Sequence, residues 1–284
     1  MGSAHTARLD DLLLAKKSAS DPEVREALLR LSSELKRRME RASSGSDDFF
    51  VSSLRALSRI KGSAQADLRL TCLCDCANYF YLRGNHRASV EACHMLRGLA
   101  GQVGSKPWMR RSESLLGVAY ADIGSVAEAL IHYAAGLELA LEIEDKAGQQ
   151  SIWINAGVAL NYAGLYRESL PCFNHAARMA MEIPELRPLA AMAYTNVAQA
   201  YLYTDEFKRG FEAIKVALAL STEPSIASEA LSRAIRECTY TQLAVELHEY
   251  EDAKAHAALC AKYGAWGDNR RGTAMALVAS GLCE

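Results

Sequence analysis

The chain has 284 residues, half of them apolar, which is enough to bury a substantial core without help from disulfides or metals. Its 32 lysines and arginines against 34 aspartates and glutamates leave a formal charge of −2, so no overall positive field favours nucleic acid as a partner. The longest apolar opening, residues 12–15, is far too short for a secretion signal or a membrane span.

Apolar residues recur at spacings of three and four almost throughout, which predicts an all-α protein. The first helix is expected at about residues 7–17. A second opens at Asp21, with a proline in its first turn, and ends near Ser43. Ser46 or Asp47 is a candidate cap for the third helix, FFVSSLRALSRI. Residues 1–66 are therefore predicted to form an N-terminal helical cap or a degenerate repeat.

Five segments of the remaining chain align with one another without gaps. They are CANYFYLRGNHRASVEACHMLR from Cys76, LGVAYADIGSVAEALIHYAAGL from Leu116, AGVALNYAGLYRESLPCFNHAA from Ala156, VAQAYLYTDEFKRGFEAIKVAL from Val197 and YTQLAVELHEYEDAKAHAALCA from Tyr240. Their first residues lie 40, 40, 41 and 43 positions apart. A nearly fixed period of this size indicates a repeat architecture in which each unit packs against its neighbours.

The columns of this alignment alternate in size in a way that suits helix packing, because small residues on one helix leave room for large residues of the neighbouring helix. The small column of the first helix holds Ala77, Gly117, Gly157, Ala198 and Thr241, and a large column of the second helix holds Tyr133, Phe173 and Ile214. Another column holds Gly84, Gly124, Gly164 and Asp205. We expect the first helix of each pair to end there in a left-handed residue that turns the chain.

This pattern resembles the tetratricopeptide repeat (TPR), most closely in LGVAYADIGSVAEALIHY and AGVALNYAGLYRESLPCF. The period is longer than the usual TPR and is similar to the long-repeat branch found in kinesin light chains and in the N-terminal regions of bacterial signalling proteins. The resemblance covers Leu70 to about Tyr263. It implies a right-handed superhelical solenoid, with five repeats and the first helix of a sixth in residues 67–284.

Three closely spaced cysteines, Cys72, Cys74 and Cys76, raise the question of a metal site or a redox switch. Successive helical residues turn by about 100°, so Cys72 and Cys76 share a face and Cys74 points roughly opposite. Three such sulfurs cannot converge on one zinc ion. Two of them fit as small core residues, whereas Cys74 is expected on the groove face, where a reactive thiol is the alternative. The pattern of all eight cysteines favours reduced thiols and a cytoplasmic protein.

No motif for catalysis or for a cofactor is evident in the sequence. There is no glycine-rich phosphate loop and no Gly-x-Ser-x-Gly elbow, and HEYED at His248 lacks the second histidine of a zinc protease. We therefore predict that the chain is not an enzyme and holds no cofactor or metal.

Polar residues on the first helices of a solenoid face its groove, where packing gives them no role. In the TPR family, asparagines in the column of Asn155 and Asn196 bind the backbone of an extended peptide. An amide group suits this task because it donates and accepts at once. The candidate groove residues are Asp75, Asn78, Asn155, Asn161, Tyr162, Asn196, Gln199, Tyr203 and Gln242. The alternative is that these amides bridge neighbouring repeats.

The family's clamp for a terminal carboxylate is not reproduced, since Cys74, Ser114, Ile154 and Thr195 stand in its basic positions. The sequence therefore predicts a module that binds an extended protein or peptide segment in its groove, as a regulatory or scaffolding part of a longer protein. The alternative is a sensory domain that binds a small signal molecule and controls a C-terminal effector such as a diguanylate cyclase or a transcription regulator. The apolar groove residues Leu115, Val118, Ile154 and Val158 favour this alternative.

The last segment, DNRRGTAMALVASGLCE, has the pattern of a first repeat helix with a cap at Asp268. No second helix follows it, and solenoid ends usually carry a polar cap. We therefore expect the native protein to continue with the missing helix and an effector domain, or this end to pair with a second copy as a homodimer.

Overall fold

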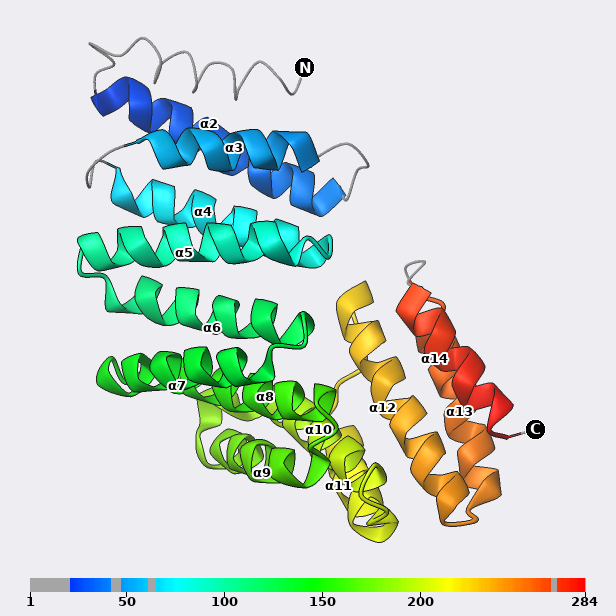
Figure 1. Cartoon of the computed structure of the whole chain (residues 1–284). Helices are drawn as coiled ribbons and strands as arrows, with labels where there is room; N and C mark the ends of the chain where they lie inside the picture. Colours follow the sequence, from blue (N-terminus) through cyan, green and yellow to red (C-terminus); the bar gives the residue numbers. More distant parts are fainter. Residues whose placement is uncertain (1–20, 42–46, 61–64, 267–269, 284) are drawn as a thin grey trace. The chain divides into compact units, whose positions relative to one another are not determined.

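The computed structural model describes residues 21–41, 47–60, 65–266 and 270–283. Within these ranges every regular element is helical, which confirms the predicted all-α fold (Figure 1). The elements are α2 (Asp21–Arg41), α3 (Asp47–Arg59), α4 (Ala66–Leu82), α5 (His86–Gln102), α6 (Lys106–Asp122), α7 (Val126–Glu142), α8 (Lys146–Tyr162), α9 (Tyr166–Glu182), η1 (Pro184–Leu189), α10 (Ala190–Leu202), α11 (Phe207–Ala219), α12 (Ala227–Glu246), α13 (Tyr250–Gly264) and α14 (Arg270–Gly281). The helix expected at 7–17 and the cap expected at Asp268 lie outside the described residues.

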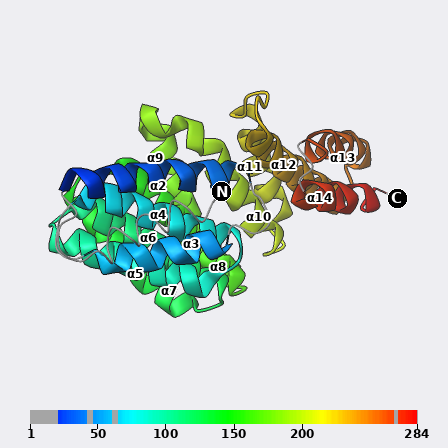
Figure 2. The same ribbon diagram turned by 90° about the horizontal axis from the view of Figure 1, so that it is seen from above.

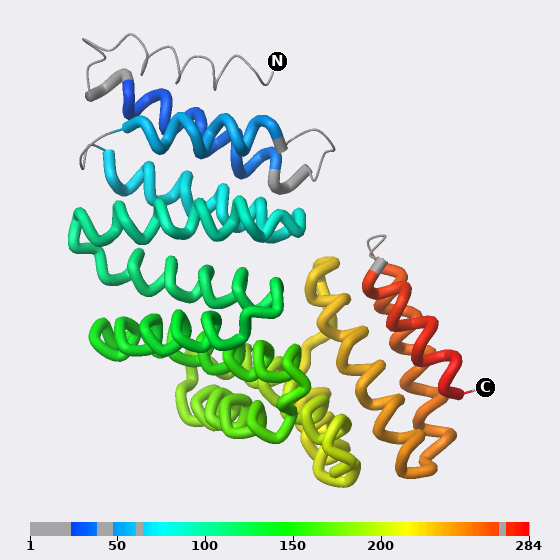
Figure 3. The backbone as a smooth tube through the Cα atoms, viewed as in Figure 1, coloured from blue at the N-terminus to red at the C-terminus, as the bar shows by residue number. Residues whose placement is uncertain are grey.

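The chain divides into two compact units, residues 1–152 and 153–284, with the boundary inside α8. In the first unit α4 packs on α5 and α6 on α7, and Figure 2 separates α2, α4 and α6 from α3, α5 and α7 as two layers. In the second unit α10 packs on α11 and α12 on α13, and α14 contacts both α12 and α13 (Figure 3). The domain boundary expected after residue 66 stays a prediction, although α4 begins at that residue.

The helices before the first repeat share one core with it. The ring of Phe50 in α3 stacks on Tyr79 of α4 and meets Phe80 edge-on, and Leu28 of α2 is fully buried in the same cluster. Because α2 and α3 cover the apolar face of α4, they stabilise the first repeat as a preceding repeat would.

The small and large columns meet as the repeat pattern predicts. A methyl group added at Gly117 would lie 2.4 Å from the Tyr133 ring, and one added at Gly157 would lie 2.5 Å from the Phe173 ring. Both rings are buried. Only glycine therefore lets the first helix of these two repeats approach the second so closely.

The predicted left-handed turns are confirmed, with φ of +72° to +82° at Gly84, Gly124 and Gly164 and of +61° at Asp205. The fifth copy turns in the same way at His248, with φ of +64°. A left-handed residue also joins α7 to α8, where Glu144 has φ of +55°. This conformation is costly for residues other than glycine, so the turns at Glu144 and His248 are strained. The alignment did not predict this strain.

Replacing Glu144 by glycine is expected to raise the free energy of unfolding by about 0.5–1 kcal/mol, because removal of the left-handed penalty exceeds the entropy that glycine adds to the unfolded chain. The Glu144 side chain is exposed, so little contact is lost. Urea denaturation followed by circular dichroism measures the change. Gly104→Ala, in the equivalent turn between α5 and α6 with φ of +67°, is the matched control and should destabilise the chain. A destabilised Glu144→Gly chain would contradict the explanation.

All three clustered cysteines are buried, with at most 2% of each side chain exposed. Burial raises the pKa of the Cys72 thiol to about 12 and also raises the pKa of Cys74. The open alternative of a reactive thiol at Cys74 is therefore disfavoured, because a thiol that is inaccessible and protonated is a poor nucleophile. Instead its sulfur accepts a hydrogen bond from Nδ2 of Asn78 at 3.6 Å.

Two buried carboxylates in different repeats are each bonded to one arginine and one histidine, although Arg97 lies on the preceding helix α5 and Arg233 on the same helix as its glutamate. Glu113 is bonded to Nε of Arg97 and to Nδ1 of His132, each at 2.7 Å. Glu237, which is fully buried, is bonded to Nε of Arg233 at 2.6 Å and to His256. The aligned segments of these repeats start at Leu116 and Tyr240. In both repeats the glutamate lies three residues before this start and the histidine lies sixteen residues after it.

Candidate binding surface

The predicted groove residues of the second unit lie on α8, on α12, and on α10 with the residue that follows it. On α10, Asn196, Gln199 and Tyr203 follow the spacing i, i+3, i+7, which places them on one helix face. Asn196 and Gln199 are half-buried, and the Tyr203 side chain is 57% exposed. The equivalent positions of α8 are Asn155, which is half-buried, and Tyr162, which is 64% exposed. Each of these two polar stripes thus runs from half-buried amides to an exposed ring.

Asn155 and Asn196 make no side-chain hydrogen bond to any other residue in the described part of the chain. The amide of Gln199, by contrast, donates to the hydroxyl of Thr239 on α12 at 3.3 Å, and that hydroxyl donates to the carbonyl of Ile235. Gln199 therefore bridges neighbouring repeats, which is the structural alternative stated above. The two asparagines do not, so both of their hydrogen-bonding groups stay available to a ligand.

The remaining second-unit residues differ in their surroundings. Gln242 on α12 is half-buried. Tyr203 stacks on Tyr166, with ring centroids 4.6 Å apart, so an aromatic pair stands at the exposed end of the α10 stripe. Asn161 departs from the α8 stripe, because its Oδ1 is buried and has no hydrogen-bond partner. We name the surface made by Asn155, Tyr162, Asn196, Gln199, Tyr203 and Gln242 the amide face.

Asp75 and Asn78 belong to the first unit, on α4. Desolvation raises the pKa of Asp75 against the opposing charges of Lys36 and Arg111, and its Oδ2 is buried without a hydrogen-bond partner. Asn78 is bonded to the buried sulfur of Cys74. Both residues belong to the first compact unit, and their role as groove residues stays a prediction.

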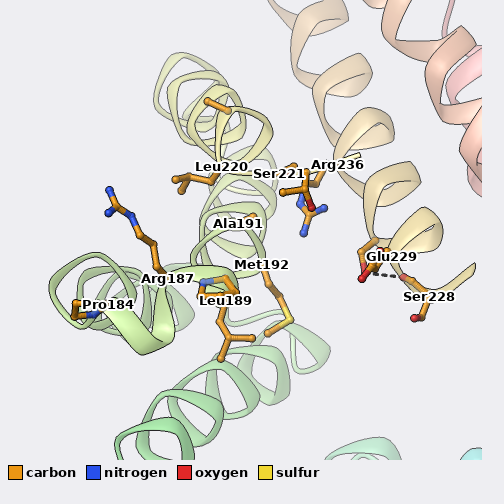
Figure 4. Close-up of a pocket in the computed structure, with 14 residues that line it drawn as sticks. Pro184, Arg187, Leu189, Ala191, Met192, Leu220, Ser221, Ser228, Glu229 and Arg236 are labelled. Atoms are coloured by element: carbon orange, nitrogen blue, oxygen red, sulfur yellow. Dashed lines mark hydrogen bonds between the residues drawn. The ribbon is translucent and has the colours of Figure 1, made fainter. Parts of the chain in front are cut away.

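The sequence did not predict a cavity of about 780 Å³ in the second unit, between η1, α10, α11 and the start of α12 (Figure 4). Its walls include the linkers between the third and fourth and the fourth and fifth repeats. These are the two places where the repeat spacing rises from 40 to 41 and 43 residues. This longer spacing is the sequence signal that could have indicated the cavity, because extra linker residues leave room between neighbouring helices.

No helix in the described residues is long and apolar enough to cross a membrane.

No protein-family model and no curated protein sequence match the chain. Solved structures do match it over most of its length. The aspartyl phosphate phosphatase F from Bacillus subtilis aligns with a TM-score of 0.60 and 15% identity, covering 89% of this chain and 68% of that one. The apo form of RapI aligns with a TM-score of 0.62 and 13% identity, covering 98% and 81%.

NprR in complex with its cognate peptide NprX aligns with a TM-score of 0.61 and 14% identity, covering 90% of this chain and 72% of NprR. At such identities the likeness concerns the fold. It agrees with the paired helices, the small and large columns and the left-handed turns described above. The chain is therefore an all-α protein with a TPR-like fold that resembles, by structure, the Rap and NprR regulators of bacterial signalling.

Proposed function

We propose that this chain binds an extended segment of a protein or peptide partner on the amide face, and that it acts through binding rather than catalysis. The observation that carries the proposal is the pair Asn155 and Asn196, two half-buried amides in the same repeat column whose side chains have no hydrogen-bond partner among the described residues. The complex of NprR with its cognate peptide supports the idea that a solenoid of this fold accommodates a peptide.

The chemistry of the amide face suits a peptide backbone. Each asparagine can donate to a backbone carbonyl and accept from a backbone N–H, so an extended segment that passes both amides gains paired bonds at two points. Tyr162 and Tyr203 supply exposed rings on which an apolar side chain of the partner can pack. The proposal thus assigns backbone recognition to the asparagines and side-chain contact to the tyrosines.

The double change Asn155→Ala and Asn196→Ala is expected to weaken peptide binding by about 2 kcal/mol, or roughly thirtyfold in Kd, because each lost hydrogen bond contributes about 1 kcal/mol. The probe is a heptapeptide selected from a random display library on the unchanged chain, and fluorescence polarisation measures its Kd. The melting temperature should change little, because neither side-chain amide forms a hydrogen bond within the part of the chain that the structure describes.

Asn174→Ala is the matched control, since Asn174 is exposed on α9 and lies outside the amide face. Equal affinity of the double variant and the control would contradict the proposal, as would a library that yields no binding peptide.

A second candidate function is a sensory domain for a small signal molecule that controls a C-terminal effector, such as a diguanylate cyclase or a transcription regulator. The cavity of about 780 Å³ favours it, because its volume falls within the usual range of small-molecule sites. A thermal-shift screen against acyl and peptide signals tests this candidate, and a uniformly flat result would count against it.

A further inference from the structure

Three charged residues line the cavity between η1, α10, α11 and α12: Arg187, Glu229 and Arg236. Figure 4 shows the guanidinium of Arg236, on α12, pointing into the space between α12 and α10, whereas that of Arg187 points away from it. Leu189, Met192 and Leu220, from η1, α10 and the end of α11, are the large apolar side chains among the lining residues and form the apolar wall of the cavity. The cavity therefore combines the guanidinium of Arg236 with an aliphatic surface.

Among the described residues Arg236 forms no salt bridge, although the charge of the adjacent Glu237 raises its pKa and so partly opposes the effect of burial. The neighbouring carboxylate, Glu237, uses one oxygen for Arg233 and the other for His256. The Nε of Arg236 is buried and has no hydrogen-bond partner. Burial, and secondarily the like charge of Arg233, lower the pKa of Arg236. A half-buried guanidinium whose Nε has no hydrogen-bond partner is stabilised when an anion joins it.

The other polar groups of the cavity do not supply that anion. Glu229 lies two turns before Arg236 on α12, about 10 Å along the helix axis. Its Oε2 already accepts hydrogen bonds from the backbone N–H of Ser225 at 2.8 Å and from the Ser225 hydroxyl at 2.9 Å. Ser232 lines the cavity one turn before Arg236 and donates to the carbonyl of Ser228, so its oxygen lone pairs can still accept a bond.

We infer that this cavity binds a carboxylate carried on a short aliphatic body, with Arg236 as its counter-ion. The planar fork of a guanidinium matches the two oxygens of a carboxylate, and the wall of Leu189, Met192 and Leu220 accommodates the aliphatic part. A small organic acid and the C-terminal end of an apolar peptide share this chemistry. The inference does not depend on the amide face, because none of its residues lines the cavity.

Hexanoate is the first probe, with hexanamide and inorganic phosphate as comparisons. Nuclear magnetic resonance of the whole chain follows the Met192 methyl group and the side-chain N–H of Arg236 during each titration. We expect hexanoate to shift both signals with one Kd, hexanamide to bind at least about tenfold more weakly because it lacks the charge-assisted bond, and phosphate to leave the methyl signal unchanged. Equal binding of hexanoate and hexanamide would overturn the role of Arg236, and tighter binding of phosphate would overturn the assignment of a carboxylate.

Substitutions separate the site from general effects of charge. Arg236→Gln is expected to weaken hexanoate binding at least about tenfold, and Arg236→Lys to weaken it less, since the charge remains and the fork is lost. Arg167→Gln, at an exposed position of α9 outside the cavity, is the matched control and should bind as the unchanged chain does.

The same variants report on stability without any probe. Removal of an unpaired buried charge should leave the melting temperature of Arg236→Gln equal to or above that of the unchanged chain, which separates lost binding from lost folding. A clearly lower melting temperature would show that Arg236 has a structural partner and would overturn the inference.

Two further experiments are needed. One distinguishes a peptide C-terminus from a small organic acid as the ligand, and the other separates binding in the cavity from binding on the amide face. Acetyl-Leu-Leu with a free terminus should compete with hexanoate, whereas its C-terminal amide should not; competition by both would contradict recognition of the carboxylate. The Asn155→Ala and Asn196→Ala chain should bind hexanoate normally, so the failure of either proposal is visible separately from the other.

Discussion

Replacing Glu237 by alanine is expected to lower the free energy of unfolding by about 3 kcal/mol, the lower end of the range for breaking a buried ion pair. The carboxylate is fully buried, and both oxygens are occupied by Arg233 and His256. Its removal leaves Arg233 on α12 and His256 on α13 without their shared acceptor. Because Arg233 and His256 each retain partial exposure, water recovers some of the loss and the upper end of the range is not reached. Chemical denaturation followed by circular dichroism measures the effect.

The first unit provides an independent repeat of this experiment. Glu113→Ala should be similarly costly, because Glu113 is buried and bonded to Arg97 of α5 and to His132, and Glu113 and His132 stand in the columns of Glu237 and His256. Glu251→Ala is the matched control, since its pair with Lys254 is exposed and should contribute less than about 1 kcal/mol. If Glu237→Ala were no more destabilising than Glu251→Ala, the buried carboxylate would have no structural importance.

Replacing Gly264 by alanine is expected to destabilise the second unit by about 2–3 kcal/mol. A methyl group there would lie 2.4 Å from the carbonyl oxygen of Gly272, at the contact of α13 with α14. The obstacle is backbone, which cannot rotate away as a side chain does, so the two helices must separate. Gly272→Ala should have the same effect, because its methyl group would lie 2.6 Å from the carbonyl oxygen of Gly264.

Gly98→Ala is the control for this pair of variants. Gly98 lies within α5 and has no atom within 4 Å of an added methyl group, so alanine there should stabilise the helix by about 0.5–1 kcal/mol. Melting curves of the three variants compare the signs directly. A neutral Gly264→Ala chain would show that α14 can leave α13 at little cost.

The repeat pattern placed Asn155 and Asn196 in one column, and ligand binding by these residues stays a prediction. Asn155 and Asn196 have the half-buried, unpaired amides that a ligand needs. Gln199 turned out to bridge α10 to α12, and Asn161 has a buried oxygen. A column of the alignment fixes the direction of a side chain relative to its own helix. It does not state which residue of the next helix lies within hydrogen-bonding distance, so it could not separate ligand contact from bridging.

The sequence by itself determined the helical fold, the helix pairs, the close contacts of Gly117 with Tyr133 and of Gly157 with Phe173, and the left-handed turns. These features depend on residues close in sequence or in adjacent helices of one repeat, whose spacing the period records. Only the tertiary structure decided the burial of Cys74, the ion pairs of the buried Glu113 and Glu237, and the buried Nε of Arg236 that has no hydrogen-bond partner. Burial and ion pairing are set by side chains that several helices bring together. Among the described residues Arg236 forms no salt bridge, because the two oxygens of the adjacent carboxylate bond to Arg233 and His256.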